Sequence, residues 1–371
     1  MFAKAQTVVQ LMEQFAPKHL AVPDDKIGLQ LGSLRKEVGK VLVALDVTDE
    51  VVEEAIAEKA ELIIAHHAII FRPLAHLRTD LPAGRLYEKL IKNDIAVYIA
   101  HTNLDAAEGG INDMLAKALG LTELSVLEPT YEDKLRKLVV FVPEDHQDAV
   151  RDAMFNAGAG WIGQYSSCSF NVEGTGTFLP GEEASPFIGR RGKLEKVREV
   201  RIETIVPESR ERAVVQAMLK AHPYEEVAYD LYPLGIPGRS YGIGRVGRLN
   251  EPATVGALAG RVKQALDVPT VRVVGDLDRP VRKVAVLGGS GGKYVRHALH
   301  AGADVFITGD VDYHAAHDAL SAGLAIIDPG HNIEKIMKRG VADYLNEQLR
   351  RGKYATVALA SAINTEPFQF V

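Results

Sequence analysis

The stretch Leu62-Ile63-Ile64-Ala65-His66-His67 decides the expected fold, because a run of apolar residues ends in a pair of histidines. Such a run, bounded by turn residues, indicates a strand buried on both faces, which is typical of a parallel sheet. Two later runs have the same design: residues 95–100 precede His101, and residues 324–327 precede Asp328. In open α/β sheets, ligands bind outside the carboxyl ends of the strands. We therefore expect an α/β protein in which the three strand ends form one site.

The segments before and after the middle of the chain alternate strand and helix patterns. Before it, the apolar runs at 40–45, 62–65 and 95–100 are separated by amphipathic helical patterns. After it, the runs at 284–287, 305–307 and 324–327 lead into helical patterns, the last of them at 335–349. Strands separated by helices predict βαβ units and mostly parallel sheets.

The middle of the chain contains an internal repeat. Phe141-Val142-Pro143-Glu144 recurs 64 residues later as Ile205-Val206-Pro207-Glu208, and the same offset places Ala153-Met154 on Ala217-Met218. Each copy predicts a strand, a Pro-Glu helix start and an amphipathic helix. Two such units with further strands predict a ferredoxin-like α+β domain. We assign residues 130–236 to this inserted domain, and residues 1–129 and 237–371 to a larger core domain.

Composition and charge narrow the class of protein. The chain has 371 residues, of which 47% are hydrophobic and 25% charged, and its formal net charge is −6. The negative balance argues against a general binder of nucleic acids or acidic membranes. The single cysteine, Cys168, excludes an intrachain disulfide and a thiolate metal cage. The first residues lack a signal-peptide core and no run of about 18 apolar residues occurs, so we expect no membrane association and a cytoplasmic location.

The candidate ligands differ in how specific their patterns are. His66-His67 alone fits hydrogen-bonded loop histidines equally well, and Asp105 alone fits a helix cap. His331 and Glu334 are three residues apart, so they lie on one face of a helix start, where a carboxylate alone would serve as a cap or dipole partner. Taken jointly, these residues favour a composite metal site, because imidazole and carboxylate hold zinc, iron or manganese.

Gly288-Gly289-Ser290-Gly291-Gly292 follows an apolar run and precedes a helical pattern. Its backbone N–H groups could cradle an anion. The segment lacks the ending of a P-loop and the spacing of a dinucleotide fingerprint. A tight strand–helix turn is the simpler interpretation.

Several motifs in fixed order resemble the GTP cyclohydrolase 1 type 2 homolog family, also called NIF-three-like. They are Asp25-Lys26-Ile27-Gly28-Leu29-Gln30, Ala65-His66-His67, His101-Thr102-Asn103-Leu104-Asp105, Gly242-Ile243-Gly244-Arg245-Val246-Gly247, Thr308-Gly309-Asp310 and Asp328-Pro329-Gly330-His331-Asn332-Ile333-Glu334. One departure is Asp24-Asp25-Lys26, where many members have Trp-Asp-Asn. The family's longer bacterial members carry an insert similar to P-II proteins and the CutA fold, which agrees with the internal repeat.

The resemblance implies a NIF-three-like core of two βα halves. It also implies two divalent metal ions per chain, and a toroidal homohexamer whose sites face an internal cavity. The implied ligands are His66, His67, Asp105, His331 and Glu334. Five ligands cannot fill two tetrahedra, so we expect Asp105 or Glu334 to bridge the ions and a water to complete the pair. Zinc is the expected metal, with iron, manganese or cobalt as alternatives.

Two functions remain open at this point. The first is a metal-dependent hydrolase acting on a nucleotide or a related small heterocycle, with His101 as the catalytic acid–base group. The alternative role for His101 is to hydrogen-bond a metal ligand. The second function is a non-catalytic metal-binding or regulatory protein whose insert senses a small ligand.

Overall fold

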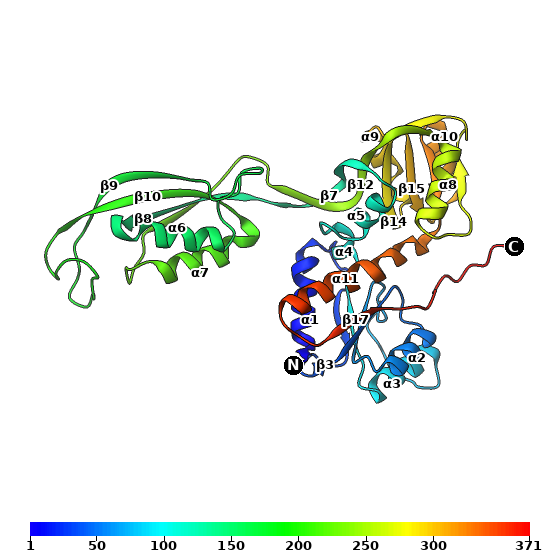
Figure 1. Cartoon of the computed structure of the whole chain (residues 1–371), viewed down its shortest axis with the longest axis horizontal. Helices are drawn as coiled ribbons and strands as arrows, with labels where there is room; N and C mark the ends of the chain where they lie inside the picture. Colours follow the sequence, from blue (N-terminus) through cyan, green and yellow to red (C-terminus); the bar gives the residue numbers. More distant parts are fainter. The chain divides into compact units, whose positions relative to one another are not determined.

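The computed structural model describes residues 1–371 and divides the chain into two compact units (Figure 1). The core unit comprises Met1–Tyr131 and Tyr241–Val371, and the inserted unit comprises Glu132–Ser240. Two long strands, β7 (Thr122–Asp133) and β12 (Arg239–Thr254), continue across these boundaries. The boundaries of the two units, at 131/132 and 240/241, therefore lie within strands.

The first sheet of the core unit has the strand order β17-β4-β5-β6-β2. The strands are β17 (Val357–Ala360), β4 (Lys40–Ala44), β5 (Leu62–Ala65), β6 (Ala96–Ile99) and β2 (Gly28–Leu31). All neighbours are parallel except β2, which is antiparallel to β6. Every residue of β5 and β6 is buried, as the continuous apolar runs predicted.

The second sheet of the core unit is mixed, with the strand order β13-β16-β15-β14-β12-β7. Its remaining strands are β13 (Arg272–Val274), β14 (Pro280–Ser290), β15 (Val305–Gly309) and β16 (Ala325–Asp328). The three strands predicted from apolar runs, β14, β15 and β16, are parallel to one another. The flanking strands β12 and β13 are antiparallel to them. The α/β prediction is therefore confirmed, and parallel pairing is confined to the centre of this sheet.

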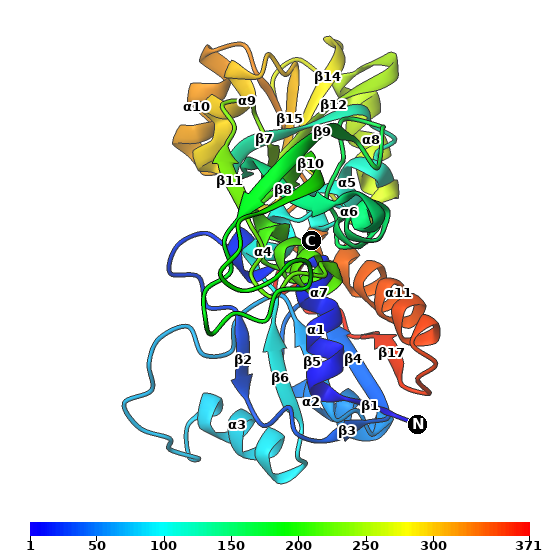
Figure 2. The same ribbon diagram turned by 90° about the vertical axis from the view of Figure 1, so that its left-hand side faces the viewer.

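Helices lie between the two sheets and join them through one hydrophobic core (Figures 1 and 2). In that layer, α11 (Ile336–Arg351) packs on β4 and β17, and α5 (Ile111–Ala118) packs on β14. The other helices of the core unit are α1 (Ala5–Phe15), α2 (Asp49–Glu58), α3 (Pro82–Lys92), α4 (Thr102–Ala106), α8 (Val255–Ala265), α9 (Val295–His300) and α10 (Tyr313–Ser321). Because α5 and α11 also contact each other, the carboxyl ends of strands from both sheets are held at one place.

The inserted unit is a four-stranded antiparallel sheet with the strand order β11-β8-β10-β9. Its elements are β8 (Leu135–Pro143), α6 (Gln147–Asn156), β9 (Ser169–Phe178), β10 (Glu195–Pro207), α7 (Glu211–Ala221) and β11 (Tyr229–Pro233). The chain order βαββαβ with this strand order is the ferredoxin-like fold, which confirms the sequence prediction. Both copies of the internal repeat form a strand, a short 3₁₀ turn and a helix, and Met154 and Met218 are fully buried at equivalent positions.

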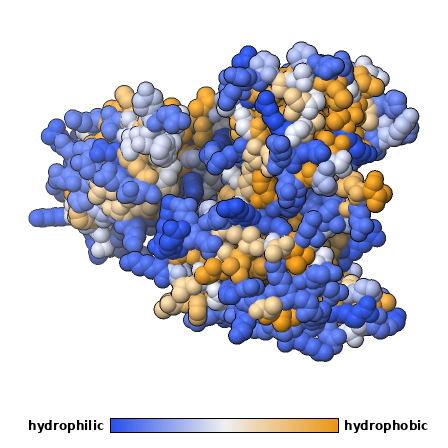
Figure 3. All heavy atoms as spheres, turned by 45° about the vertical axis from the view of Figure 1, so that its right-hand side comes forward, coloured by the Kyte–Doolittle hydropathy of each residue, from blue (hydrophilic) through white to orange (hydrophobic).

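The surface shows the usual mixture of polar and apolar groups. On the face drawn in Figure 3, hydrophilic residues predominate and hydrophobic ones form separate patches. Isolated apolar residues on a surface are normal in folded proteins. No helix combines the length and the apolar character that a membrane span requires.

Candidate metal centre

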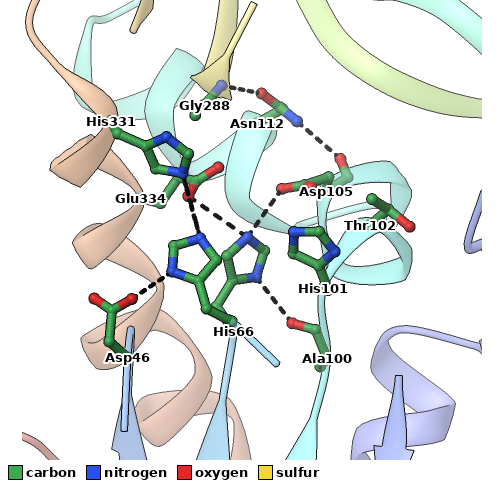
Figure 4. A network of polar contacts seen from close by, with 12 residues as sticks. Asp46, His66, Ala100, His101, Thr102, Asp105, Asn112, Gly288, His331 and Glu334 are labelled. Carbon is green, nitrogen blue, oxygen red and sulfur yellow. Dashed lines mark hydrogen bonds and ion pairs between the residues drawn. The ribbon is translucent and has the colours of Figure 1, made fainter. Parts of the chain in front are cut away.

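The structure brings all five predicted ligands together in the core unit (Figure 4). His66 and His67 directly follow β5, and Asp105 lies in α4, just after β6. His331 and Glu334 lie in a 3₁₀ turn, η5 (His331–Lys335), between β16 and α11. Residues three apart in a 3₁₀ turn project on the same side, so both side chains reach the other three.

The Glu334 carboxylate lies in the middle of the cluster. Its Oε2 atom is 3.1 Å from His331 Nε2, 3.2 Å from His67 Nε2 and 3.7 Å from His66 Nε2. Asp105 Oδ1 is 3.8 Å from His66 Nε2 on the other side. The potential ligand atoms therefore form the groups His67–His331–Glu334 and His66–Asp105–Glu334, which share only Glu334.

Three of these atoms are buried without a hydrogen-bond partner. They are His66 Nε2, Asp105 Oδ1 and Glu334 Oε2, because none of their contacts within the cluster counts as a hydrogen bond. Leaving a buried polar atom unpaired costs on the order of 1–3 kcal/mol, so such atoms are rare in folded proteins. A cation between them would satisfy all three, and the residues present therefore fit a metal.

The opposite ring nitrogen of each histidine is held by an oxygen. The Nδ1–H group of His66 donates to the Ala100 carbonyl at 2.9 Å, that of His67 to Asp46 at 2.7 Å, and that of His331 to Asp310 at 2.7 Å. Because a carbonyl or an ionised carboxylate oxygen can only accept, each Nδ1 carries a proton and each Nε2 is directed at the cluster. Such bonds fix the orientation of metal-binding histidines.

Sequence reasoning did not assign the two supporting carboxylates. Asp46 follows β4, and Asp310 follows β15 within the quoted Thr308-Gly309-Asp310 motif. Both come just after a strand, as the predicted ligands do. Their position after a strand could have identified them in the sequence. The same position, however, does not distinguish a metal ligand from a residue that orients a ligand.

His101 lies beside the cluster and is also oriented by a carboxylate. Its ring centroid is 4.9 Å from that of His66, and its Nδ1–H group donates to Asp25 Oδ1 at 2.8 Å. The other oxygen of Asp25 accepts from the Thr102 N–H at 3.0 Å and from the Thr102 hydroxyl. His101 also forms a potential ligand group with His66 and His67. The geometry thus allows His101 to serve either as an acid–base group beside the centre or as a further metal ligand.

The electrostatics of the cluster favour positive charge. Burial alone would lower the pKa of His67, but Asp46 and Glu334 raise it to about 10. The neighbouring Glu334 carboxylate raises the pKa of His331 to about 9. Burial opposes ionisation of Glu334, yet the surrounding imidazoles hold its pKa well below the usual range. Burial raises the pKa of Asp105 to about 6. A divalent cation would experience the same attraction that favours the imidazolium forms.

The glycine-rich segment completes the wall of the cluster. Gly288 and Gly289 belong to β14, and the Gly288 N–H donates to Asn112 Oδ1 at 2.9 Å. Gly289 has a φ of +66°, and a Cβ atom there would lie 2.4 Å from Glu334 Oε1. The segment therefore allows the backbone to approach the carboxylate, a role beyond the turn that the sequence suggested.

The comparisons with known proteins identify the family. Residues 3–367 match the family described as Duf34/NIF3 (NGG1p interacting factor 3). The chain belongs to the DUF34/NIF3 family. It is 57% identical to a GTP cyclohydrolase 1 type 2 homolog of Halalkalibacterium halodurans, over 100% of this chain and 99% of that protein. It is 54% identical to the Bacillus subtilis homolog, over 99% of this chain and 98% of that protein.

Among solved structures, a Bacillus cereus protein related to NIF3 matches with a TM-score of 0.96 and 54% identity over 100% of both chains. A Staphylococcus aureus protein matches with a TM-score of 0.78 and 33% identity, over 100% of this chain and 99% of that one. The resemblance drawn from the sequence motifs is therefore confirmed. In this member of the family, the five predicted residues lie at one centre.

Proposed function

We propose that this protein is a metal-dependent hydrolase whose centre holds two divalent ions and acts on a nucleotide or a related small heterocycle. The observation that carries the proposal is the convergence of three unpaired buried atoms, those of His66, Asp105 and Glu334. The two ligand groups share only Glu334, so we assign the bridging role to this residue rather than to Asp105. Zinc is the first metal to test, followed by iron, manganese and cobalt.

The residues around the centre suit hydrolysis. Two bound ions would lower the pKa of a water molecule towards neutrality and offset the negative charge that develops on the attacked group. His101 would move the proton, because Asp25 holds its Nδ1–H and leaves Nε2 available on the side of the ligands. A positioned acid–base group of this kind contributes on the order of 10²–10⁴ in rate. Because the relatives are named as GTP cyclohydrolase homologs, GTP is the first substrate to test.

The second candidate is a non-catalytic metal-binding or regulatory protein. The inserted unit favours it, because that unit contains a cavity of about 670 Å³ without residues of the metal centre.

We further propose that the chain assembles as a toroidal homohexamer, which light scattering would test by mass. Either function is compatible with such an assembly.

The deciding experiment combines metal analysis with hydrolysis of GTP and a panel of nucleotides. The protein is stripped with a chelator and reloaded with Zn²⁺ or Mn²⁺. We expect turnover by the reloaded protein, full metal content in His101→Ala, and a rate on the order of 10²–10⁴ lower in that variant. Asp25→Asn should keep its metal and lose on the order of tenfold in rate, because His101 is no longer oriented.

Asp24→Asn is the matched control, because it removes the same charge from the exposed neighbouring residue. It should leave both the metal content and the rate unchanged. Absence of turnover on the whole panel at full metal content would favour the regulatory function. Loss of metal from His101→Ala would instead make His101 a ligand.

A further inference from the structure

A cavity of about 670 Å³ lies in the inserted unit, on the face of the sheet opposite to α6 and α7. The helices pack on Val140, Val200 and Ile202, whereas the alternate residues, including Phe141, Glu199 and Arg201, line the cavity. Residues 179–194, between β9 and β10, cover one side of it. The volume falls within the range of roughly 300–1,000 Å³ that is typical of small-molecule sites.

The covering segment 179–194 is held in place by hydrogen bonds. The Gly192 N–H donates to the Pro180 carbonyl at 2.9 Å and closes the base of the segment. The Ser185 N–H donates to Glu225 Oε1 at 2.7 Å and fixes the tip to the opposite wall. The cavity is therefore bounded by ordered chain on both sides.

Two glycines of β9 make the floor. Gly174 and Gly176 line the cavity and belong to the run Val172-Glu173-Gly174-Thr175-Gly176-Thr177 of β9. A Cβ atom at Gly176 would lie 2.0 Å from Glu199 Oε2. The absence of a side chain at Gly176 therefore lets the Glu199 carboxylate extend over the strand.

A cluster of aromatic rings lies beside that carboxylate. The Tyr224 hydroxyl donates to Glu199 Oε1 at 2.9 Å. The centroid of the Tyr224 ring is 6.0 Å from that of Phe178 and 6.4 Å from that of Phe187, and all three residues line the cavity. Aromatic faces beside a carboxylate attract organic cations.

The charged side chains that line the cavity are mostly negative. Four glutamates line the cavity, and the only basic residue among the lining residues is Arg201. Arg201 is already paired, because its Nη2 atom is 3.0 Å from Glu203 Oε1. The glutamates are Glu173, Glu199, Glu225 and Glu226. An anion would be repelled here, whereas a cation would find both charge and aromatic surface.

We propose that this cavity binds a small organic cation, namely an amine or quaternary ammonium group carried on an apolar or aromatic body. The cationic group is placed against Glu199 and Tyr224, and the apolar body against Phe178, Phe187 and the covering segment. Binding at this site requires none of the metal ligands, so the proposal stands independently of the hydrolase function.

The test uses the full-length protein and two probes of similar size and opposite charge, benzyltrimethylammonium and 3-phenylpropionate. Isothermal titration calorimetry should detect the cation and not the anion. Glu199→Gln should weaken binding of the cation by roughly tenfold or more, as expected for loss of a charged partner. Gly176→Val, which displaces the Glu199 carboxylate, should do the same. Amide hydrogen exchange should slow in residues 172–194 when the cation is added to the unmodified protein.

Glu183→Gln is the matched control, because Glu183 is an exposed residue of the covering segment that does not line the cavity. It removes the same charge and should leave the affinity unchanged. Three results would overturn the proposal: no binding of benzyltrimethylammonium at millimolar concentration, equal binding of both probes, or equal weakening by Glu183→Gln and Glu199→Gln.

Discussion

At the scale of single residues, the proposed metal centre requires a position without a side chain beside Glu334. Gly289 allows β14 to approach Glu334, and its φ of +66° is strained for any other residue. We predict that Gly289→Ala lowers the affinity for Zn²⁺ by roughly 10–100-fold, the range seen when groups supporting a ligand are changed. Competition with a chromogenic chelator measures this affinity.

The control for this prediction is Gly120→Ala. Gly120 has a similar φ of +69°, but a Cβ atom there would meet nothing within 4 Å. Both variants carry the same backbone strain, on the order of 1 kcal/mol, so only the contact with Glu334 distinguishes them. Equal metal affinity in the two variants would show that the approach of Gly289 is unimportant.

The convergence of the candidate ligands was predictable because each follows a strand that its own apolar run reveals. His66 and Asp105 follow neighbouring parallel strands of one sheet, whose carboxyl ends meet at one edge. His331 follows β16 of the other sheet, so its approach depends on the packing of the two sheets through α5 and α11. The supporting contacts were not predictable in this way. Asp25 reaches His101 from a loop before β2, a pairing that depends on tertiary packing and leaves no local pattern.

At the scale of elements, prediction succeeded where a strand carries a continuous apolar run and failed where it does not. β9 alternates small and polar residues with apolar ones and is largely exposed, so it carries no continuous apolar run. Residues 242–247 of β12 are buried, but glycines interrupt the apolar run, so this segment was recognised only as a motif. The internal repeat was predictable because β8–α6 and β10–α7 bury the same positions of one helix face.

His222 makes one part of the inserted unit sensitive to acid. Its Nε2–H donates to the Phe141 carbonyl at 3.0 Å, and its Nδ1 accepts from the Tyr224 N–H at 3.1 Å. This arrangement requires the neutral ring, and burial lowers the pKa of His222 from its ordinary value of 6.5. The stabilisation is therefore complete above pH 6.5 and is lost as the pH falls below it towards the lower folded-state pKa.

We predict that the amides around Tyr224 become less protected from hydrogen exchange between pH 7.5 and 5.5, after correction for intrinsic rates. The loss corresponds to about 1 kcal/mol, the usual contribution of a buried hydrogen bond. His222→Gln keeps a donor and an acceptor but does not titrate, so its protection should stay constant. A parallel loss in both proteins would assign the effect to another group.

At the scale of the whole molecule, the two units have separate hydrophobic cores. The cluster around β8, α6 and α7 contains no residue of the core unit. Gly242 runs beside Glu128 and Pro129 within the core unit, since a Cβ atom on Gly242 would meet both residues. The chain therefore leaves and re-enters the core unit at neighbouring points, as expected for an inserted domain.

We predict that a protein lacking residues 132–240, with a short turn joining Tyr131 to Tyr241, folds and binds as much metal as the full chain. All five proposed ligands belong to the core unit, and none of their described contacts requires the insert. Circular dichroism and metal analysis measure the outcome. A folded but metal-free product would mean that the inserted unit contributes to the centre.

The central claim is that one shared carboxylate, Glu334, joins two ligand groups. Metal content per chain, measured by mass spectrometry after equilibrium dialysis against Zn²⁺, tests it most directly. The account predicts two ions in the unmodified protein and in the control Glu347→Gln, which removes an exposed carboxylate of α11 that pairs with Arg351. It predicts about one ion in Asp105→Asn and none in Glu334→Gln. Full occupancy in Glu334→Gln, or equal losses in Glu334→Gln and Asp105→Asn, would contradict it.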